Sequence, residues 1–539
     1  MIRFRVDRFP AALAALVLSF SEPAFSRDTL VSTKTAFTQA EADLGPGDTL
    51  TLADGDWTDT EIRINAIGAA GRTILLRAKT PGKAVLRGSS RLICDGKYIV
   101  MDGFSLKGNS TRTAEAITFT ANSSECRLTG TAIDGYNMPG GARDIWVYIA
   151  GFRNRVEYCS FTGKKNQGIT VRVKREGEKS DEHAIAHNYF GPRPAINGNG
   201  AEEIQIGLME TQFSDSKSIV EYNLFEECNG ELENVSVKSG GNIIRYNTFL
   251  RCESHITLRH GSGSVVAGNY IDGGGAGNTG GIRVCGKHHV IVNNFITGLR
   301  GTDEYGGGIN IHGGDATDPK TDPANHVPAG NTLVAYNTIA DNREGIVYGG
   351  MGATAPTGAV ISDNIIMSGT GTLFSMRAST PFAKAEANIL FGTGTGIGKL
   401  DGFATVDPAL KKSDLNGYVH YLPDIASPAR GKASGDYRIP EWPGLLPPPD
   451  IGENLYGAGK LQPLSRNQVG PAWNGGPVVS VIGKSSGSRY PASYPGGAHR
   501  MAQGRVGIFD AAGRKDSRTA GPRAQALGMK SRYFRASYL

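Results

Sequence analysis

A short motif recurs along the middle of the chain: an apolar residue, two further residues, an asparagine, one more residue and then an apolar or aromatic side chain. Its asparagines are Asn188, Asn223, Asn247, Asn269, Asn294, Asn337, Asn364 and Asn388. The steps between them are 35, 24, 22, 25, 43, 27 and 24 residues. A period of roughly 20–30 residues with short alternating strands is typical of a solenoid, and the longer steps indicate a coil plus an insertion.

An asparagine once per coil has a physical explanation. Asparagine tolerates the left-handed backbone of a tight bend, and stacked amides hydrogen-bond from one coil to the next. A leucine-rich repeat would show Leu-x-x-Leu-x-Leu, which is absent, and a propeller would need blades of about 40 residues. The sequence therefore predicts an all-β, single-stranded, right-handed parallel β-helix with about three short strands per coil. The 74 glycines among 539 residues suit its many turns.

The ends of a solenoid need covers. Residues 33–44 read as a short amphipathic capping helix, and residues 48–52 as the strand that enters the first coil. We expect one β-helix domain over 27–473, with the repeat running to about residue 425 and a Pro-rich C-terminal cap after it. Residues 474–539 are rich in Gly, Ser and Arg and are expected to form a disordered basic tail.

The first 26 residues have the pattern of a signal peptide. Three arginines precede an apolar run of ten residues at 11–20, and Ala24-Phe25-Ser26 is a small-x-small cleavage site. No stretch reaches the roughly 18 apolar residues of a membrane span. We expect cleavage before Arg27 and a mature protein that is secreted or periplasmic.

Net charge and cysteine content exclude two classes of function. The net charge is +6, but residues 474–539 contribute +9 and residues 1–26 contribute +1, which leaves −4 for the body. An acidic body argues against nucleic-acid binding. None of the six cysteines forms a C-x-x-C pair, so a zinc site is not expected. Cys228 and Cys252 occupy equivalent positions on adjacent coils, where a disulfide is feasible but a ladder of free thiols is favoured.

Two cations are predicted to stack on one outer face of the solenoid. Aligning 235–240 with 256–261 sends the apolar side chains inward, and it places Lys238 and Arg259 outward on neighbouring coils. Arg283, another 24 residues on, extends this column. Stacked like charges are unusual on a purely structural sheet, although a solvated basic face remains an alternative.

Two glutamates precede this column. Glu231 and Glu233 are two residues apart and share one face if they lie on a strand, with Leu232 pointing inward and a corner at Asn234. They are either solvated, or a glycosidase acid–base pair, or ligands of a hard cation. Side-by-side carboxylates fit the second alternative poorly. The nearby Asn199 offers a further oxygen ligand.

The segments GELENVSVKSGGNIIRYNTFLRC and HITLRHGSGSVVAGNYI resemble polysaccharide lyase family 6, which contains alginate lyases and chondroitinase B. The resemblance covers roughly residues 28–473, and it implies a parallel β-helix that performs β-elimination at a uronic acid. Asn234 departs from the aliphatic residue expected there. By motif position, the resemblance implies Lys238 as the general base, Arg259 as the general acid, His260 and Arg283 as substrate-binding residues, and Asn199, Glu231 and Glu233 as Ca²⁺ ligands.

We therefore expect an exported, Ca²⁺-dependent lyase that acts on an anionic polysaccharide as a monomer. Alginate is the favoured substrate, and dermatan sulfate is the alternative within the family. A β-helix glycoside hydrolase would need a water-activating carboxylate pair in register, which is not seen. A non-catalytic carbohydrate-binding solenoid would not require Lys238 and Arg259 beside Glu231 and Glu233.

Overall fold

The computed structural model describes residues 26–478, with the exception of 197, 303–305, 416, 432–454, 457–458 and 462. A second unit, 485–539, lies outside the described residues. So do the expected signal peptide, apart from Ser26, and the expected basic tail from residue 479 onward. Among the described residues, no helix is both long and apolar enough to cross a membrane.

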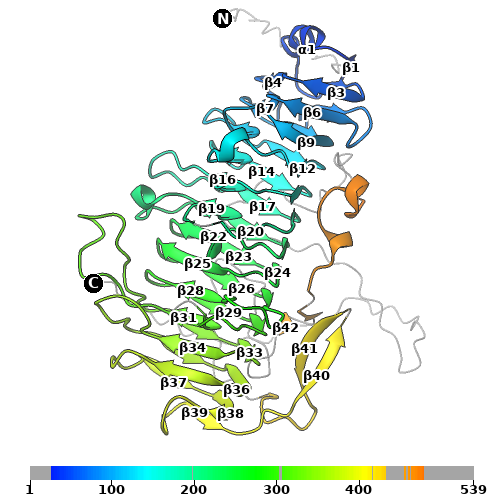
Figure 1. Cartoon of the computed structure of the whole chain (residues 1–539). Helices are drawn as coiled ribbons and strands as arrows, with labels where there is room; N and C mark the ends of the chain where they lie inside the picture. Colours follow the sequence, from blue (N-terminus) through cyan, green and yellow to red (C-terminus); the bar gives the residue numbers. More distant parts are fainter. Residues whose placement is uncertain are drawn as a thin grey trace, which may run out of the picture. The chain divides into compact units, whose positions relative to one another are not determined.

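Successive strands of the described chain join three parallel ladders in turn, which is the architecture of a parallel β-helix (Figure 1). The first ladder comprises β1 (Asp28–Val31), β2 (Thr49–Leu52), β5 (Ile74–Ala78), β8 (Ile99–Asp102), β11 (Arg127–Thr129), β14 (Arg155–Glu157), β17 (Ala184–Ala186), β20 (Ile219–Glu221), β23 (Ile243–Arg245), β26 (Val265–Ala267), β29 (Val290–Val292), β32 (Leu333–Ala335), β35 (Val360–Ser362) and β37 (Lys384–Glu386). The second ladder comprises β3 (Gly55–Thr58), β6 (Ala84–Gly88), β9 (Phe104–Ser110), β12 (Ala132–Asp134), β15 (Ser160–Thr162), β18 (Tyr189–Phe190), β21 (Leu224–Glu226), β24 (Thr248–Leu250), β27 (Tyr270–Asp272), β30 (Phe295–Thr297), β33 (Thr338–Ala340), β36 (Ile365–Met376), β38 (Asn388–Gly394) and β39 (Phe403–Thr405).

The third ladder carries the site described below. It comprises β4 (Glu61–Ile64), β7 (Arg91–Cys94), β10 (Ile117–Phe119), β13 (Val147–Ile149), β16 (Val171–Val173), β19 (Ile204–Ile206), β22 (Glu233–Lys238), β25 (His255–His260), β28 (Ile282–Val284), β31 (Ile309–Ile311) and β34 (Glu344–Tyr348), and it joins the second ladder through the long strand β36. The predicted β-helix is confirmed. The parallel strands end at β39, before residue 425.

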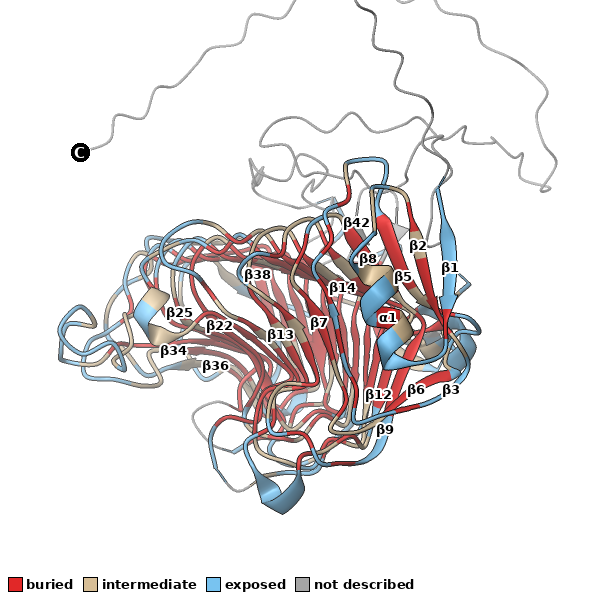
Figure 2. Ribbon diagram, turned by 90° about the horizontal axis from the view of Figure 1, so that it is seen from above, coloured by how far each residue is buried: buried red, intermediate tan, exposed pale blue. Residues whose placement is uncertain are grey.

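The interior is a continuous apolar core. Alternate residues of each short strand point inward, so equivalent side chains stack from coil to coil, and Figure 2 shows the buried strands surrounded by exposed turns. One interior row consists of stacked phenylalanines, with ring centroids 4.6 Å apart between Phe190 and Phe225 and 4.4 Å apart between Phe225 and Phe249. All six cysteines are buried and free. The interpretation of Cys228 and Cys252 as free thiols is therefore confirmed.

The N-terminal cap is the helix α1 (Lys34–Glu41). The Thr33 side chain accepts a hydrogen bond from the Ala36 amide at 3.2 Å, which satisfies one of the free N–H groups at the helix start. Phe37 is buried against the first coil. The sequence prediction for this end of the solenoid is confirmed.

The asparagines of the repeat form one hydrogen-bonded ladder. The side-chain oxygen of each asparagine from Asn223 to Asn388 accepts from both the backbone amide and the side-chain amide of the previous one, at 2.9 to 3.2 Å. The left-handed bend, however, falls one residue earlier, as at Tyr222 (φ 53°) and Tyr246 (φ 55°). The asparagine follows the bend and hydrogen-bonds to the next coil. Because the asparagine is not the bend residue itself, an aromatic residue such as Tyr222 or Tyr246 can occupy the bend.

The chain after β39 leaves the repeat. β40 (Leu410–Leu415) and β41 (Tyr418–Pro423) pair antiparallel, as do the short strands β42 (Leu455–Tyr456) and β43 (Gly459–Lys460). The described residues of 461–478, here called the C-terminal strap, then run back along the second ladder and include the 3-10 turns η3 (Arg466–Gln468) and η4 (Ala472–Asn474) (Figure 1).

The C-terminal strap is anchored to coils that lie more than 200 residues earlier in the sequence. The Leu464 amide donates to Thr248 Oγ1 at 2.8 Å, and the Arg466 guanidinium lies 3.9 Å from the centre of the Tyr189 ring. Trp473 Nε1 donates to the Gly130 carbonyl at 2.7 Å. Leu461, Leu464 and Val469 of the strap are buried against outward-facing side chains of the second ladder.

Candidate active site

Three carboxylates converge at the start of β22. Glu233 is the first residue of this strand, Glu231 lies in the turn before it, and Glu202 ends the loop that leads into β19. One oxygen from each lies within 4.8 Å of the others. Glu202 and Glu233 are buried, whereas Glu231 is partly exposed. This places three potential anions in a space in which water cannot fully separate them.

A cationic set surrounds these carboxylates. Lys238 Nζ lies 3.5 Å from Glu202 Oε1, and Glu233 Oε1 lies 3.5 Å from Arg259 Nη1 and 3.4 Å from Arg283 Nη1. Glu233 also accepts a short hydrogen bond from the Ser236 hydroxyl. The site thus brings together five of the residues selected from the sequence: Glu231, Glu233, Lys238, Arg259 and Arg283.

The electrostatics of the two neighbouring glutamates differ. Burial raises the pKa of Glu231 to about 8, with the charges of Glu202 and Glu233 adding to the effect. Burial also opposes ionisation of Glu233, but the nearby Arg259, Lys238 and Arg283 outweigh it and lower the pKa of Glu233. At neutral pH one carboxylate therefore keeps a proton while its neighbour is ionised.

The carboxylate cluster fits a hard divalent cation. Its donors are all oxygens, and two oxygens on opposite sides of Ca²⁺ at 2.3–2.6 Å would be about 5 Å apart, similar to the spread observed. Glu202 Oε2 is buried without a hydrogen-bond partner among the described residues. A bound cation would coordinate that oxygen of Glu202 and would take the place of the proton on Glu231.

Asn199 is adjacent in sequence to Gly200, which bonds to the cluster, and its role as a cation ligand stays a prediction. It is exposed, and its backbone carbonyl accepts a hydrogen bond from Gln167 Nε2 at 2.5 Å. The Gly200 amide donates to Glu231 Oε2 at 2.9 Å, so this turn lies directly beside the carboxylates. The third carboxylate is Glu202, which the sequence analysis missed. Its position two residues before the alternating residues of β19 was the available signal.

The stacking of the cations differs from the predicted column. Val235 pairs with Ile256 and Val237 with Leu258, as expected, but a register shift then pairs Lys238 with His260. Arg259 is the extra residue at this irregularity. Arg283 pairs with Thr257, so it stands in a different row, which comprises Tyr148, Arg172, Gln205, Ser236, Thr257, Arg283 and Asn310. The three cations reach the carboxylates from two rows of the third ladder.

The turn around the glutamates also differs in part. A register shift between Glu233 and Val235 confirms the predicted irregularity at Asn234. Leu232, however, has a relative exposure of 42% and does not point into the core. The reason is that β22 begins only at Glu233, so strand alternation does not apply to Leu232.

His260 is buried at the end of β25 beside these groups. Burial lowers its pKa to about 3, with a further contribution from His326 and Arg259, so its imidazole is neutral at physiological pH. Its ring stacks on that of His326, with centroids 5.4 Å apart and an angle of 11° between the planes. His326 belongs to the long insertion after Gly313, which accounts for the 43-residue step between Asn294 and Asn337.

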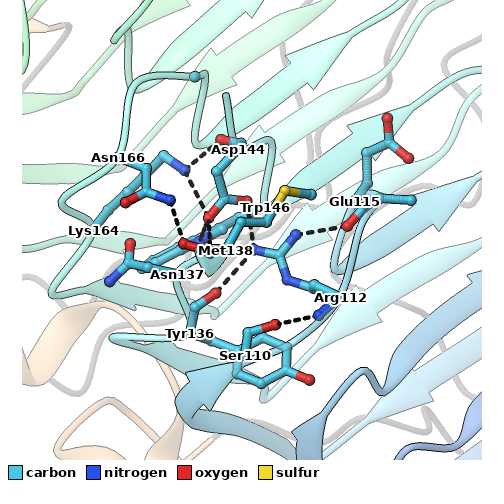
Figure 3. A network of polar contacts seen from close by, with 12 residues as sticks. Ser110, Arg112, Glu115, Tyr136, Asn137, Met138, Asp144, Trp146, Lys164 and Asn166 are labelled. Carbon is cyan, nitrogen blue, oxygen red and sulfur yellow. Dashed lines mark hydrogen bonds and ion pairs between the residues drawn. The ribbon is translucent and has the colours of Figure 1, made fainter. Parts of the chain in front are cut away.

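A second buried network supports the coils on the N-terminal side of the site (Figure 3). The carboxylate of Asp144 pairs with Arg112 and accepts hydrogen bonds from the Met138 amide at 3.0 Å and from Trp146 Nε1 at 3.2 Å. Lys164 Nζ donates to the Asp144 carbonyl at 2.5 Å and lies 4.8 Å from the centre of the Trp146 ring. Burial lowers the pKa of Lys164 well below its usual range.

Arg193 links this network to the carboxylate cluster. Its guanidinium donates to the carbonyls of Asn166 and Gly168 at 2.8 Å and to the Glu202 carbonyl at 3.2 Å, and it pairs with Glu203 at 3.3 Å. A buried arginine with several acceptors fixes the backbone around it. The coil that carries Glu202 is therefore held rigidly. The sequence gave no periodic signal for Arg193, because it lies in an insertion.

Together, the fold and the site define a class of protein: a parallel β-helix with a lysine, two arginines and a carboxylate cluster gathered on one outer face, an arrangement suited to an acidic polysaccharide. The family model described as chondroitinase B matches residues 31–395. The chain belongs to this family of polysaccharide lyases, which is polysaccharide lyase family 6 (PL6).

Solved structures agree with this assignment. The PL6 alginate lyase AlyGC is 33% identical over 73% of this chain and 55% of its own, with a TM-score of 0.68. A variant of AlyGC is 30% identical over 84% of this chain and 59% of its own, with a TM-score of 0.71. A mannuronic acid-specific family 6 lyase from human gut microbiota is 29% identical over 71% of this chain and 91% of its own, with a TM-score of 0.65. The chain thus spans little more than half of the AlyGC length. No curated protein sequence matches it significantly.

Proposed function

We propose that this protein cleaves a uronate-containing polysaccharide, alginate above all, by Ca²⁺-assisted β-elimination that leaves a 4,5-unsaturated uronate end. The observation that carries the proposal is the meeting of Lys238 and Arg259 with the carboxylates Glu202, Glu231 and Glu233 on one face. A base, an oxygen-directed hydrogen-bond donor and a hard-cation site are the three elements that this elimination needs.

The reaction removes the proton on C5 of the uronate, and the electron pair of that bond forms the C4=C5 double bond while the C4–O bond breaks toward oxygen. Lys238 is proposed to take the C5 proton. Arg259 is proposed to donate a hydrogen bond to the departing oxygen, which takes its proton from solvent because a guanidinium is a poor acid. Ca²⁺ bound to the carboxylates would supply positive charge against the uronate carboxylate, where negative charge develops.

The resting ion pair between Lys238 and Glu202 bears on the role of the base. In the resting site Lys238 Nζ points at Glu202 Oε1, so a lysine that is to reach the C5 proton requires Glu202 to engage another partner. Gln205 Nε2 already donates to Glu202 Oε1 at 2.6 Å, and Glu202 Oε2 is the orphaned oxygen. Glu202 is thus proposed to pass from Lys238 to the cation site when the enzyme is loaded.

The choice of alginate rests on two observations. The PL6 structures at 29–33% identity are described as alginate lyases or as a mannuronic acid-specific lyase. The mature body carries a net charge of −4, which suits a carboxylated chain better than a densely sulfated one. The name of the family model keeps dermatan sulfate as the second candidate. We also propose, from the N-terminal pattern, that the protein is exported to the periplasm or beyond. We further propose that it acts as a monomer.

The test is the ultraviolet absorbance of the conjugated double bond during incubation with polymannuronate, polyguluronate and dermatan sulfate, each with Ca²⁺ and with a chelator. We expect the absorbance to rise with an alginate substrate and Ca²⁺. The same assay on Lys238→Arg is expected to give no comparable rise. Absence of the double bond with every substrate, or reducing ends formed without it, would indicate a hydrolase or a binding protein instead.

A further inference from the structure

The insertion between β31 and β32 folds back over the candidate site and is held at several points. The Gly314 amide donates to the Thr354 carbonyl at 2.8 Å, and Thr354 returns a bond to the Gly314 carbonyl at 2.9 Å. The Gly286 amide donates to the Val327 carbonyl at 2.9 Å, and Gln212 Nε2 donates to the Pro323 carbonyl at 2.9 Å. These anchors come from three other coils, so the insertion presents its side chains in a defined position.

Within the insertion, Asp315 fixes His326 through two bonds to a single carboxylate oxygen. The His326 amide donates to Asp315 Oδ2 at 2.7 Å, and ring Nδ1 lies 2.9 Å from the same oxygen. The carboxylate of Asp315 is held ionised, because the backbone bond from His326 lowers its pKa. An ionised carboxylate only accepts, so the Nδ1 atom carries the proton and the lone pair is on Nε2.

That lone pair faces Arg283. Arg283 Nη2 lies 3.4 Å from His326 Nε2, while Nη1 of the same guanidinium lies 3.4 Å from Glu233 Oε1. Arg283 Nη2 also lies 3.8 Å from the Met351 sulfur, a weak acceptor. The guanidinium is therefore held from both ends, by a carboxylate of the candidate cation site and by an aspartate-oriented histidine.

The two holds are not equivalent. Glu233 has Arg259, Arg283 and the Ser236 hydroxyl as partners and is also a candidate cation ligand. Several groups therefore compete for the oxygens of Glu233 that contact Arg283. His326 Nε2 has no such competing role. We propose that the Asp315–His326 pair is a positioning device that holds Arg283 in the orientation needed to bind a uronate carboxylate. This inference rests on the proposed function and deepens it.

The environment of His326 supports a neutral acceptor. Arg283 and Arg259 face it from the third ladder and His260 stacks on its ring, while the carboxylate of Asp315 is the anion in contact with it. Burial lowers the pKa of His326, and both arginines act in the same direction. A protonated ring would lose its acceptor atom and oppose the guanidinium that it holds.

The experiment measures the affinity for mannuronate and guluronate oligosaccharides by calorimetry in a Lys238→Ala background, which removes turnover, with Ca²⁺ present. His326→Ala is expected to weaken binding roughly ten- to hundredfold, the usual effect of losing a hydrogen bond to a charged group. His326→Gln places an amide oxygen near the Nε2 position and is expected to restore binding to within about threefold of the parent. His326→Asn places its oxygen near the Nδ1 position and should remain weak.

Thr317→Ala, an exposed position on the same insertion, is the matched control and should bind like the parent. Equal affinity for parent, Ala and Gln variants would overturn the inference. Equal loss in the Ala, Gln and Asn variants would also overturn it, since ring bulk rather than the Nε2 acceptor would then matter. A parent that binds no uronate oligosaccharide would refute the proposed function itself, and the inference with it, whereas intact parent binding with unaffected variants refutes the inference alone.

Discussion

Calcium binding to this protein should release a proton from Glu231. Without a cation, burial and the charges of Glu202 and Glu233 raise the pKa of Glu231 to about 8. At pH 7 a group with that pKa is about 90% protonated, and at pH 9 about 10%. A divalent cation at the cluster needs the ionised carboxylate, so it must displace this proton.

The magnitude follows from this linkage. We expect about 0.9 of a proton released per Ca²⁺ at pH 7 and about 0.1 at pH 9, and the apparent affinity should rise about tenfold between them, or about 1.4 kcal/mol. The sign is fixed by the direction of the shift: affinity increases with pH until the pKa is passed and is then level. Because the folded state then holds a proton that the unfolded state has lost, the calcium-free fold loses stability between the ordinary glutamate pKa of 4.5 and about 8, and its stability is level above that.

The assay is calorimetric titration with Ca²⁺ in pairs of buffers of different ionisation enthalpy, at several pH values from 6 to 9. Glu231→Gln should abolish the proton release and weaken binding. Glu202→Gln should lower the release at pH 7, because it removes one of the charges that raise the pKa of Glu231. Glu178→Gln, an exposed site, is the control. A release below about 0.2 of a proton at pH 7 in the wild type would refute the assigned electrostatics.

Three further outcomes are expected. Lys238→Arg should lower kcat roughly 10²–10⁴-fold with little change in oligosaccharide affinity, whereas Arg259→Lys should lower it less. Near-normal turnover of the Lys238→Arg variant would show that Lys238 is not the base. Asp144→Ala should lower the free energy of unfolding by about 3–5 kcal/mol in urea titrations, because it leaves Arg112 and Lys164 buried without their carboxylate, and a change below about 1 kcal/mol would contradict this. Truncation after Val478 should leave stability and rate unchanged, but truncation after Lys460 should cost roughly 4–8 kcal/mol through lost apolar burial; equal thermal midpoints for both would show that the C-terminal strap contributes nothing.

The sequence predicted the features that depend on periodicity. The Asn ladder and the stacking of Val235 on Ile256 follow from repeat spacing and strand alternation, and the structure has both. The capping helix follows from an amphipathic pattern over 33–44, and the structure has it over Lys34–Glu41. The predictions failed where alternation was extended beyond a regular strand. Leu232 precedes β22, and Arg259 lies at a register shift, so neither obeys the rule applied to it.

The remaining site residues come from insertions, where no repeat constrains the chain. Glu202 and Arg193 belong to the loop after Gly191, and Asp315 and His326 to the loop after Gly313. Such loops fold back over coils that are distant in sequence, and their contacts depend on tertiary packing rather than on local pattern. The long steps of the repeat indicate that insertions are present, but they do not show which side chains the insertions bring to the site.

The path of the C-terminal strap has a consequence for how the chain matures. Trp473 covers Gly82, where even a Cβ atom would come within 2.5 Å of the indole, and it bonds to the carbonyl of Gly130. The surface around Gly82 is made early in synthesis and is covered only by a segment made some 390 residues later. Coils can stack one after another as they emerge, but the surface around Gly82 stays uncovered until Trp473 has been made. Coils near the N-terminus are thus covered by a segment that is made much later. A chain interrupted before residue 473 would expose the surface around Gly82 to proteases.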